Sequence, residues 1–422
     1  MINTIIIIVF LLAYLAIILE HSIEINKAAF AVFAGVVLWL LLSVNITDPH
    51  ELGHHLEGHF SEIAGILFFL LGAMTTVEVI DGHKGFDVIT SKLSKVSVSK
   101  LFWIVGILAF FLSAILDNLT TTILMVSLVR KMVDDSKLRW YIAGMIVISA
   151  NAGGAFSPIG DVTTTMLWIG GQITAGKLIS VLLIPSIICY IVPAIFMFLF
   201  LKKAKLLNSA GLKQVETEKT YSKESVYILV LGILGLISVP IVKSIFHVPP
   251  YMGMMLSLSV IWIAIEIISR RSADAANFTV SSALRNIDTP SILFFLGILL
   301  AVGALQTAGI LTNLSGFLSE HITSQSLLLF VTGIASAIVD NVPLVAAFQG
   351  MYDLNAIPVD SDFWHQLCYA TGTGGSLLII GSAAGVVAMG IENISFGWYF
   401  KRIALLAFIG FAAGYISLSF ML

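Results

Sequence analysis

Two similar motifs, each with an acidic residue inside an apolar segment, lie about half a chain apart. Neighbouring motifs return in the same order and at a nearly constant offset, which indicates an internal duplication. A carboxylate is costly in hydrocarbon, so acids kept at both places indicate work on ions or protons. The repeated motifs are SAILDN at 113–118 and SAIVDN at 336–341, ILFFL at 66–70 and at 292–296, and Gly153, Gly154 and Gly160 with Gly374, Gly375 and Gly381.

The composition requires a lipid setting for this duplication. Hydrophobic residues make up 58% and charged residues 11% of the 422 residues, and the mean hydropathy is +1.00. Since a crossing takes about 20 helical residues, the chain has room for about ten crossings. The balance of 22 Lys and Arg against 25 Asp and Glu excludes a nucleic-acid surface. Cys189 and Cys368 lie in apolar segments and indicate buried thiols without a disulfide or zinc site.

The order of the apolar segments predicts an all-α integral membrane protein built from two repeats. The first repeat spans 1–201, a polar linker 202–224 follows, and the second repeat spans 225–422. In each repeat we expect a paired segment, then an interrupted helix. The expected helices are 3–20, 28–44, 62–80, a pair within 101–130, 140–170 and 178–201, then 225–245, 251–269, 289–304, a pair within 326–351, 363–390 and 403–421.

Loop charges predict opposite orientations for the two repeats. The first-half loops 81–100 and 130–139 carry Lys84, Lys92, Lys95, Lys100, Arg130, Lys131, Lys137 and Arg139. Their counterparts 305–325 and 352–362 contain no Lys or Arg. Because basic loops stay on the cytoplasmic side, this asymmetry predicts an inverted repeat with a cytoplasmic linker and both termini outside.

Each paired segment is expected to be a re-entrant hairpin with its acid at the tip, because its two ends carry loops of the same charge character. Non-helical backbone at that depth survives only where protein or a water-filled cavity surrounds it. Two ordinary spanning helices with a polar kink are the alternative. The tips would be Asp117-Asn118 in 101–130 and Asp340-Asn341 in 326–351.

The interrupted helices 140–170 and 363–390 are expected to complete the site. Gly153, Gly154, Pro158 and Gly160 should open the first helix, freeing carbonyl oxygens between two half-helices. Asp161 and the following threonines add oxygen donors suited to a hard cation such as Na⁺. The second interrupted helix has Ser382 in place of the acid, so we expect the cation site to be weighted toward Asp117, Asn118 and Asp161.

With these residues in view, the chain resembles the NhaD-type sodium/proton antiporters of the ion-transporter superfamily. The resemblance rests on 113–122, 149–165, 336–343 and 68–78. It implies a scaffold part and a mobile transport part, a homodimer, and a multi-pass protein of the bacterial inner (plasma) membrane that carries Na⁺, Li⁺ and H⁺ without a cofactor. The ion-site residues that it implies are Ser113, Asp117, Asn118, Asn151, Asp161, Thr163, Thr164, Ser336, Asp340 and Asn341.

An antiport mechanism needs only competition between Na⁺ and protons for one buried carboxylate cluster, because burial and mutual repulsion favour protonation. A sodium-coupled dicarboxylate symporter is the nearest alternative. The superfamily's carboxylate carriers have a Ser-Asn-Thr type of tip, whereas both tips here are Asp-Asn. Arsenite efflux and an intramembrane enzyme with paired acids are more distant alternatives, and we expect no enzymatic activity.

Three further groups of residues have competing interpretations. Glu62 is either an acid at the start of a helix or part of a proton pathway. Glu78 is either a membrane-embedded acid of that pathway or an interfacial acid next to Asp81. His50, His54, His55 and His59 lack the order of a zinc protease motif. We interpret them as part of a solvated outer loop, and a pH-responsive role is the alternative.

Overall fold

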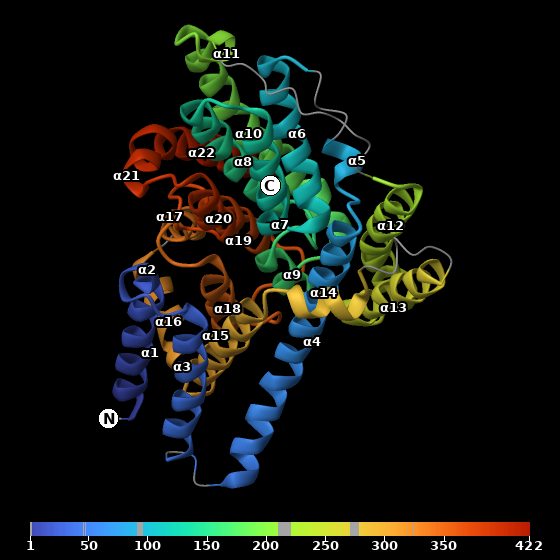
Figure 1. Ribbon diagram of the computed structural model, residues 1–422. Helices are drawn as coiled ribbons and strands as arrows, with labels where there is room; N and C mark the ends of the chain where they lie inside the picture. Colours follow the sequence, from blue (N-terminus) through green and yellow to red (C-terminus); the bar gives the residue numbers. More distant parts are fainter. Residues whose placement is uncertain are drawn as a thin grey trace.

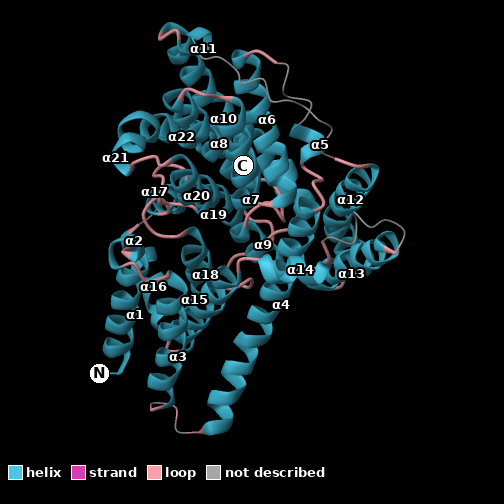
Figure 2. Ribbon diagram, in the orientation of Figure 1, coloured by secondary structure: helices cyan, strands magenta, loops and turns pink. Residues whose placement is uncertain are grey.

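The computed structural model describes residues 2–422 except 45, 47, 91–95, 210–220, 271–277 and 323, and within these residues every regular element is a helix (Figure 2). Among the described residues, seven helices are long and apolar enough to cross a membrane, and four shorter apolar helices accompany them. The chain is therefore a multi-pass integral membrane protein, as the composition predicts. Four of the basic residues on which the predicted topology rests lie outside the described residues. They are Lys92 and Lys95 of the loop 81–100 and Lys213 and Lys219 of the linker 202–224.

Figure 1 shows the arrangement of the helices. Those of the first half are α1 (Ile2–Ile18), α2 (Glu20–Ile23), α3 (Lys27–Ser43), α4 (Pro49–Gly82), α5 (Asp87–Thr90), α6 (Val98–Leu116), α7 (Asn118–Met132), α8 (Ser136–Ala155), α9 (Val162–Ile169), α10 (Ala175–Lys203) and α11 (Leu206–Ser209). Those of the second half are α12 (Lys223–Phe246), α13 (Pro250–Ser269), α14 (Val280–Asn286), α15 (Thr289–Thr307), α16 (Ile310–His321), α17 (Gln325–Ala335), α18 (Asn341–Met351), α19 (Asp362–Gly374), α20 (Ala383–Glu392), α21 (Phe396–Tyr399), η3 (Phe400–Ala404) and α22 (Leu405–Met421).

Two expected loops are helical instead. Helix α4 begins at Pro49, because the Asp48 side chain accepts a 2.9 Å hydrogen bond from the His50 N–H and proline suits the first helical position. The prediction of a histidine-bearing loop before residue 62 was therefore wrong, although His54 and His55 are solvent-exposed. Helix α16 likewise lies within 305–325, which the charge argument treated as a loop.

The expected interruptions are present in all four segments. Helices α6 and α7 are separated by Asp117, α8 and α9 by residues 156–161, α17 and α18 by residues 336–340, and α19 and α20 by residues 375–382. The first long break contains Pro158 and Gly160, which disfavour a continuous helix. In the described residues, polar motifs therefore separate consecutive helices within these apolar segments.

Close backbone approach brings the broken helices together. A Cβ atom on Gly153 of α8 would lie 2.0 Å from the Phe110 carbonyl oxygen of α6, and one on Gly374 of α19 would lie 2.0 Å from the Gly333 oxygen of α17. Ser113 Oγ donates to the Ala150 oxygen at 2.6 Å, and Ser336 Oγ donates to the Thr371 oxygen at 3.0 Å. The two halves therefore use equivalent packing at equivalent positions.

The two halves also exchange partners. Helix α7 packs against α20 of the second half, and α18 packs against α9 of the first half. In Figure 1 the red helices α19 and α20 accordingly lie beside the teal helices α7 and α8. Elsewhere α3 packs along α15, where a Cβ on Gly297 would lie 2.3 Å from the backbone of Ala31. The contacts of α7 with α20 and of α18 with α9 bring the helix interruptions of the two halves close together.

Polar contacts at the starts of α8 and α19 join the halves again. Arg139 Nε lies 2.8 Å from Glu392 Oε2 at the end of α20, and the Glu392 side chain is only 1% exposed. At the start of α19, Asp360 accepts 2.7 Å hydrogen bonds from both the backbone N–H and the hydroxyl of Thr174. Each interrupted helix is thus tied to the segment that follows the other half's interruption.

Candidate functional site

Four helix N-termini carry the chemistry of the site, because the residue that caps each of them is one that the sequence motifs marked. Three of the caps are acids, and each accepts a hydrogen bond from a backbone N–H of the first turn that it caps. The fourth is a serine. Helix N-termini favour negative charge, so the local structure itself provides positions for carboxylates in an apolar region. The caps are Asp117 for α7, Asp161 for α9, Asp340 for α18 and Ser382 for α20.

Asp161 is the centre of the hydrogen-bond network, and both halves contribute donors to it. The Asn118 amide donates to Asp161 Oδ2 at 2.6 Å, and the Asn341 amide reaches Oδ1 at 3.5 Å. Thr163 donates to Oδ1 through its backbone N–H at 2.9 Å and its hydroxyl at 2.8 Å. The Asp161 side chain is buried, and these contacts satisfy a charge that would otherwise be costly there.

A cavity of about 110 Å³, which we call the ion cavity, opens beside this network. Asp117, Asn118, Asp161, Asp340 and Asn341 all line it. The remaining wall is largely apolar and includes Phe69, Leu70, Met74, Phe294 and Phe295. Water occupies roughly 30 Å³ per molecule in the liquid, so the space suits a small ion with few waters.

Asp117 has an unusual backbone conformation, with a φ of 126°. Few residues other than glycine adopt this region, and such strain costs on the order of 1–3 kcal/mol. Its carboxylate accepts hydrogen bonds from the Thr120 backbone N–H at 2.6 Å and from the Thr120 hydroxyl at 3.1 Å. The strained turn directs an acid toward the ion cavity immediately before α7 begins.

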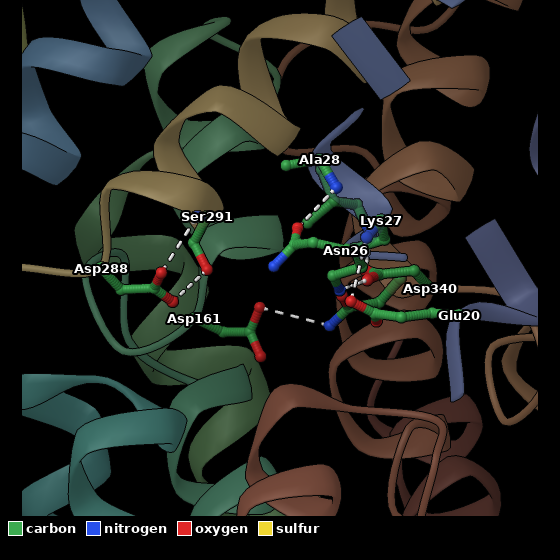
Figure 3. A network of polar contacts seen from close by, with 10 residues as sticks. Glu20, Asn26, Lys27, Ala28, Asp161, Asp288, Ser291 and Asp340 are labelled. Carbon is green, nitrogen blue, oxygen red and sulfur yellow. Dashed lines mark hydrogen bonds and ion pairs between the residues drawn. The ribbon is translucent and has the colours of Figure 1, made fainter. Parts of the chain in front are cut away.

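Asp340, the second-half acid, has a different partner. Its Oδ2 lies 2.8 Å from the ammonium of Lys27, the first residue of α3 (Figure 3). Lys27 also lies over the Phe294 ring, with its nitrogen 4.3 Å from the centroid, and its backbone N–H donates to Glu20. Among the described residues that line the ion cavity, Lys27 is the one cation.

The other residues marked by the sequence take supporting positions. Asn151 accepts from the Asn118 amide at 3.0 Å and donates to the Ser382 hydroxyl at 3.0 Å. Thr164 donates to the Asp161 carbonyl oxygen, while Ser113 and Ser336 bond to backbone oxygens of α8 and α19. These side chains hold the interrupted segments and do not belong to the cavity lining.

The two acids assigned to a proton pathway lie outside the ion cavity, at different places along α4. Glu78 is half-buried and accepts a 3.1 Å hydrogen bond from Asn286 of α14. Glu62 is exposed and lines a separate cavity of about 430 Å³, together with His59, Gln172, Gln306, Gln349 and Asp353. We call this the Glu62 cavity. Among the described side chains, no group of three or more His, Cys, Asp and Glu could hold a metal ion.

Lys27 and Thr120 are contact residues that the motif analysis missed. One sequence signal could have identified Lys27, because it is the only Lys or Arg among the first 83 residues. A lone cation in a long apolar stretch needs a partner, and here the partner comes from the other half of the chain. Thr120 lies within the quoted motif 113–122, but its role follows only from the turn at Asp117.

Comparison with known proteins identifies the family of this chain. A model of the citrate transporter family (CitMHS) matches residues 1–366. Na(+)/H(+) antiporter NhaD of Alkalimonas amylolytica is 32% identical over 90% of this chain and 83% of the relative, and that of Vibrio cholerae is 31% identical over 91% and 84%. The chain belongs to the NhaD-type sodium/proton antiporters.

The likeness to NhaD-type proteins extends to plants. Sodium/proton antiporter 1 of Arabidopsis thaliana is 43% identical over 96% of this chain and 70% of the relative. These relatives are named as antiporters, and the resemblance drawn from the Asp-Asn motifs is therefore confirmed at the level of the family. As a member of a transporter family, this NhaD-type chain is not an enzyme.

Proposed function

We propose that this chain exchanges Na⁺, and also Li⁺, for H⁺ across a membrane. One observation carries the proposal: Asp117, Asn118 and Asp161 line one small cavity where interrupted helices from both halves meet. Oxygen donors at converging helix breaks are what a hard monovalent cation requires inside a bilayer. The names of the antiporter relatives point to the same exchange.

Chemically, the exchange follows from competition for one carboxylate cluster. Asp117 and Asp161 face a common cavity, and a cation or protons can offset their charges. Coupling results when the protein changes its facing only after Na⁺ or protons occupy the cluster. We assign Na⁺ to Asp117, Asn118 and Asp161. The surrounding set that supports or extends this site is Ser113, Asn151, Thr163, Thr164, Ser336, Asp340 and Asn341.

Two further cavities provide candidate routes to opposite sides of the ion cavity. A cavity of about 200 Å³ near Asp288 and Glu20 shares Lys27, Ser291 and Asp340 with it. The Glu62 cavity is separate from the ion cavity and is lined by other residues of the same helices, α4, α9, α15 and α18. We propose that alternating access connects the site to each cavity in turn, and that Glu62 serves proton transfer on its side.

The architecture that serves this mechanism is also a proposal. Repeats 1–201 and 225–422 would have inverted topology, with re-entrant hairpins at 101–130 and 326–351, broken transmembrane helices at 140–170 and 363–390, and 202–224 as a cytoplasmic linker. Equivalent packing of Gly153 and Gly374 and the exchange of helix partners support two related units. We propose a homodimer and, for a bacterial source, the inner (plasma) membrane.

Coupled uptake of an organic anion is the second candidate, since a citrate transporter model matches most of the chain. The lining of the ion cavity disfavours it. A dicarboxylate there would meet Asp117, Asp161 and Asp340, and the one cation among the described lining residues is already paired. Like-charge contacts of this kind cost affinity, whereas a cation is attracted.

The test uses the purified full chain in sealed liposomes with a trapped pH dye. Addition of Na⁺ or Li⁺ should move protons, and K⁺ should have little effect. Asp117→Asn with Asp161→Asn should abolish the response, and Glu266→Gln, an exposed acid on α13, should retain it. Persistent Na⁺-driven proton movement in the double variant, or uptake of labelled citrate or succinate by the unmodified protein, would refute the assignment.

A further inference from the structure

The two duplicated acids differ at one position that determines how each carboxylate is satisfied. Three residues after Asp117 stands Thr120, which provides two hydrogen bonds to that carboxylate. Three residues after Asp340 stands Pro343, which has neither a backbone N–H nor a hydroxyl. Within the second half, Asp340 keeps a 3.3 Å contact with the Val342 N–H. The duplication therefore left the second acid short of donors.

Lys27 provides Asp340 with the side-chain donor that Pro343 lacks. Its ammonium lies 2.8 Å from Asp340 Oδ2, and both side chains are about a quarter exposed, at 29% and 25%. The two residues are 313 positions apart, Lys27 as the first residue of α3 and Asp340 as the cap of α18. Helix α3 packs along α15 and α1, and α18 also contacts α15, together with α9, α16 and α19. Figure 3 shows Lys27 and Asp340 facing each other, with Asp161 and Asp288 on the other side of the view.

We propose that Lys27 is a tethered cation that occupies Asp340, so that the second acid is neutralised from within and the transported ion is left to Asp117 and Asp161. The proposal rests on the proposed Na⁺/H⁺ exchange and deepens it, since it names the residue that sets the charge of the site. Thr120 satisfies the first acid while leaving its charge available. Lys27 cancels the charge of the second.

The consequence is electrostatic and can be measured. The described lining of the ion cavity carries three acids and one base, Lys27. Removal of the ammonium leaves one more negative charge near the ion, which should tighten cation binding. Removal of the Asp340 charge leaves the ammonium unpaired, which should weaken it. In a partly hydrated site, the gain or loss of one unit charge in the cavity lining changes the affinity for a cation by about three- to tenfold.

The experiment measures the KM for Na⁺ at one pH in liposomes for the unmodified chain, Lys27→Gln, Asp340→Asn, the double variant and Lys27→Arg. We expect the KM to fall about three- to tenfold in Lys27→Gln and to rise by a similar factor in Asp340→Asn. It should return to within about twofold of the unmodified value in the double variant. Lys27→Arg keeps the positive charge in a different shape, so its KM should lie closer to the unmodified value than the KM of Lys27→Gln does.

Other outcomes overturn the proposal in recognisable ways. A double variant with the raised KM of Asp340→Asn would mean that Asp340 binds the ion directly. A lower maximal rate in every variant with unchanged KM would mean that the ion pair only holds helices together. If Lys27→Gln does not fold, the double variant remains usable because it leaves no unpaired charge. Comparison of its KM with that of Asp340→Asn still distinguishes direct ion binding by Asp340 from charge neutralisation by Lys27. Failure of the unmodified chain to exchange Na⁺ for H⁺ would instead refute the proposed function.

Discussion

The Asn118 amide donates a 2.6 Å hydrogen bond to Asp161 Oδ2, joining the first turn of α7 to the residue that caps α9. Its counterpart in the second half, Asn341, reaches the same carboxylate at 3.5 Å. The two asparagines come from duplicated motifs, yet both act on one acid, because the second interrupted helix has Ser382 where the first has Asp161.

Because the Asn118 contact with Asp161 is shorter than the Asn341 contact, replacing Asn118 by alanine should impair transport more than replacing Asn341 does. Asn118→Ala should raise the KM for Na⁺ about tenfold, because the ionised carboxylate loses a short, charge-assisted donor and competes less well for the cation against protons. Asn341→Ala, which loses a longer contact, should raise it about twofold. Sodium titrations of proton flux in liposomes at one pH measure both. Equal effects, or the reverse order, would contradict the geometry around Asp161.

The Thr120 hydroxyl is expected to tune the first acid. Thr120→Val keeps the 2.6 Å backbone hydrogen bond to Asp117 but loses the 3.1 Å hydroxyl contact. The KM for Na⁺ should rise about threefold, in keeping with the net value of one hydrogen bond. Thr120→Ser is the matched control, since it retains the hydroxyl and should behave as the unmodified chain. A serine variant as impaired as the valine variant would assign the effect to packing.

The ion pair between Arg139 and Glu392 should stabilise the fold more than it affects transport. Arg139→Gln would leave Glu392, only 1% exposed, without its cation. We expect a loss of about 2–4 kcal/mol in the free energy of unfolding, allowing for the partial exposure of the arginine. Glu392→Gln leaves the charge on the more exposed partner and should cost less. Thermal unfolding in detergent compares the two, and an equal Tm for both variants would argue against this asymmetry.

Gly153 is expected to tolerate no side chain. A Cβ there would lie 2.0 Å from the Phe110 carbonyl oxygen, so Gly153→Ala must push α8 away from α6, at a cost of about 1–3 kcal/mol or more. Gly390 of α20 has no atom within 4 Å of the corresponding Cβ position. Gly390→Ala should therefore keep or slightly raise the Tm. A Gly153→Ala protein as stable as this control would show that the two helices can separate freely.

Much of the fold was predictable because its signals are local. Apolar runs located the membrane helices, and the glycines, Pro158 and polar caps located the interruptions, since each acts on the backbone within a few residues of itself. The start of α4 was predicted too late, because a polar run containing four histidines was interpreted as a loop despite the Asp48-Pro49 cap before it. The grouping of Asp117, Asn118 and Asp161 could be proposed because the duplicated Asp-Asn motif marked the first two and the glycine- and proline-rich interruption marked Asp161.

By itself, then, the sequence determined that this is a duplicated, membrane-embedded helical chain with acids at its helix interruptions. Only the tertiary structure decided which carboxylates remain available to a transported ion. Lys27 pairs with Asp340, 313 positions away in the sequence, and the Asn118 and Asn341 amides both donate to Asp161. The reason is physical. Hydrophobic length and helix breaking are properties of neighbouring residues, whereas the net charge of a buried cavity depends on side chains that only the packing of distant helices brings together.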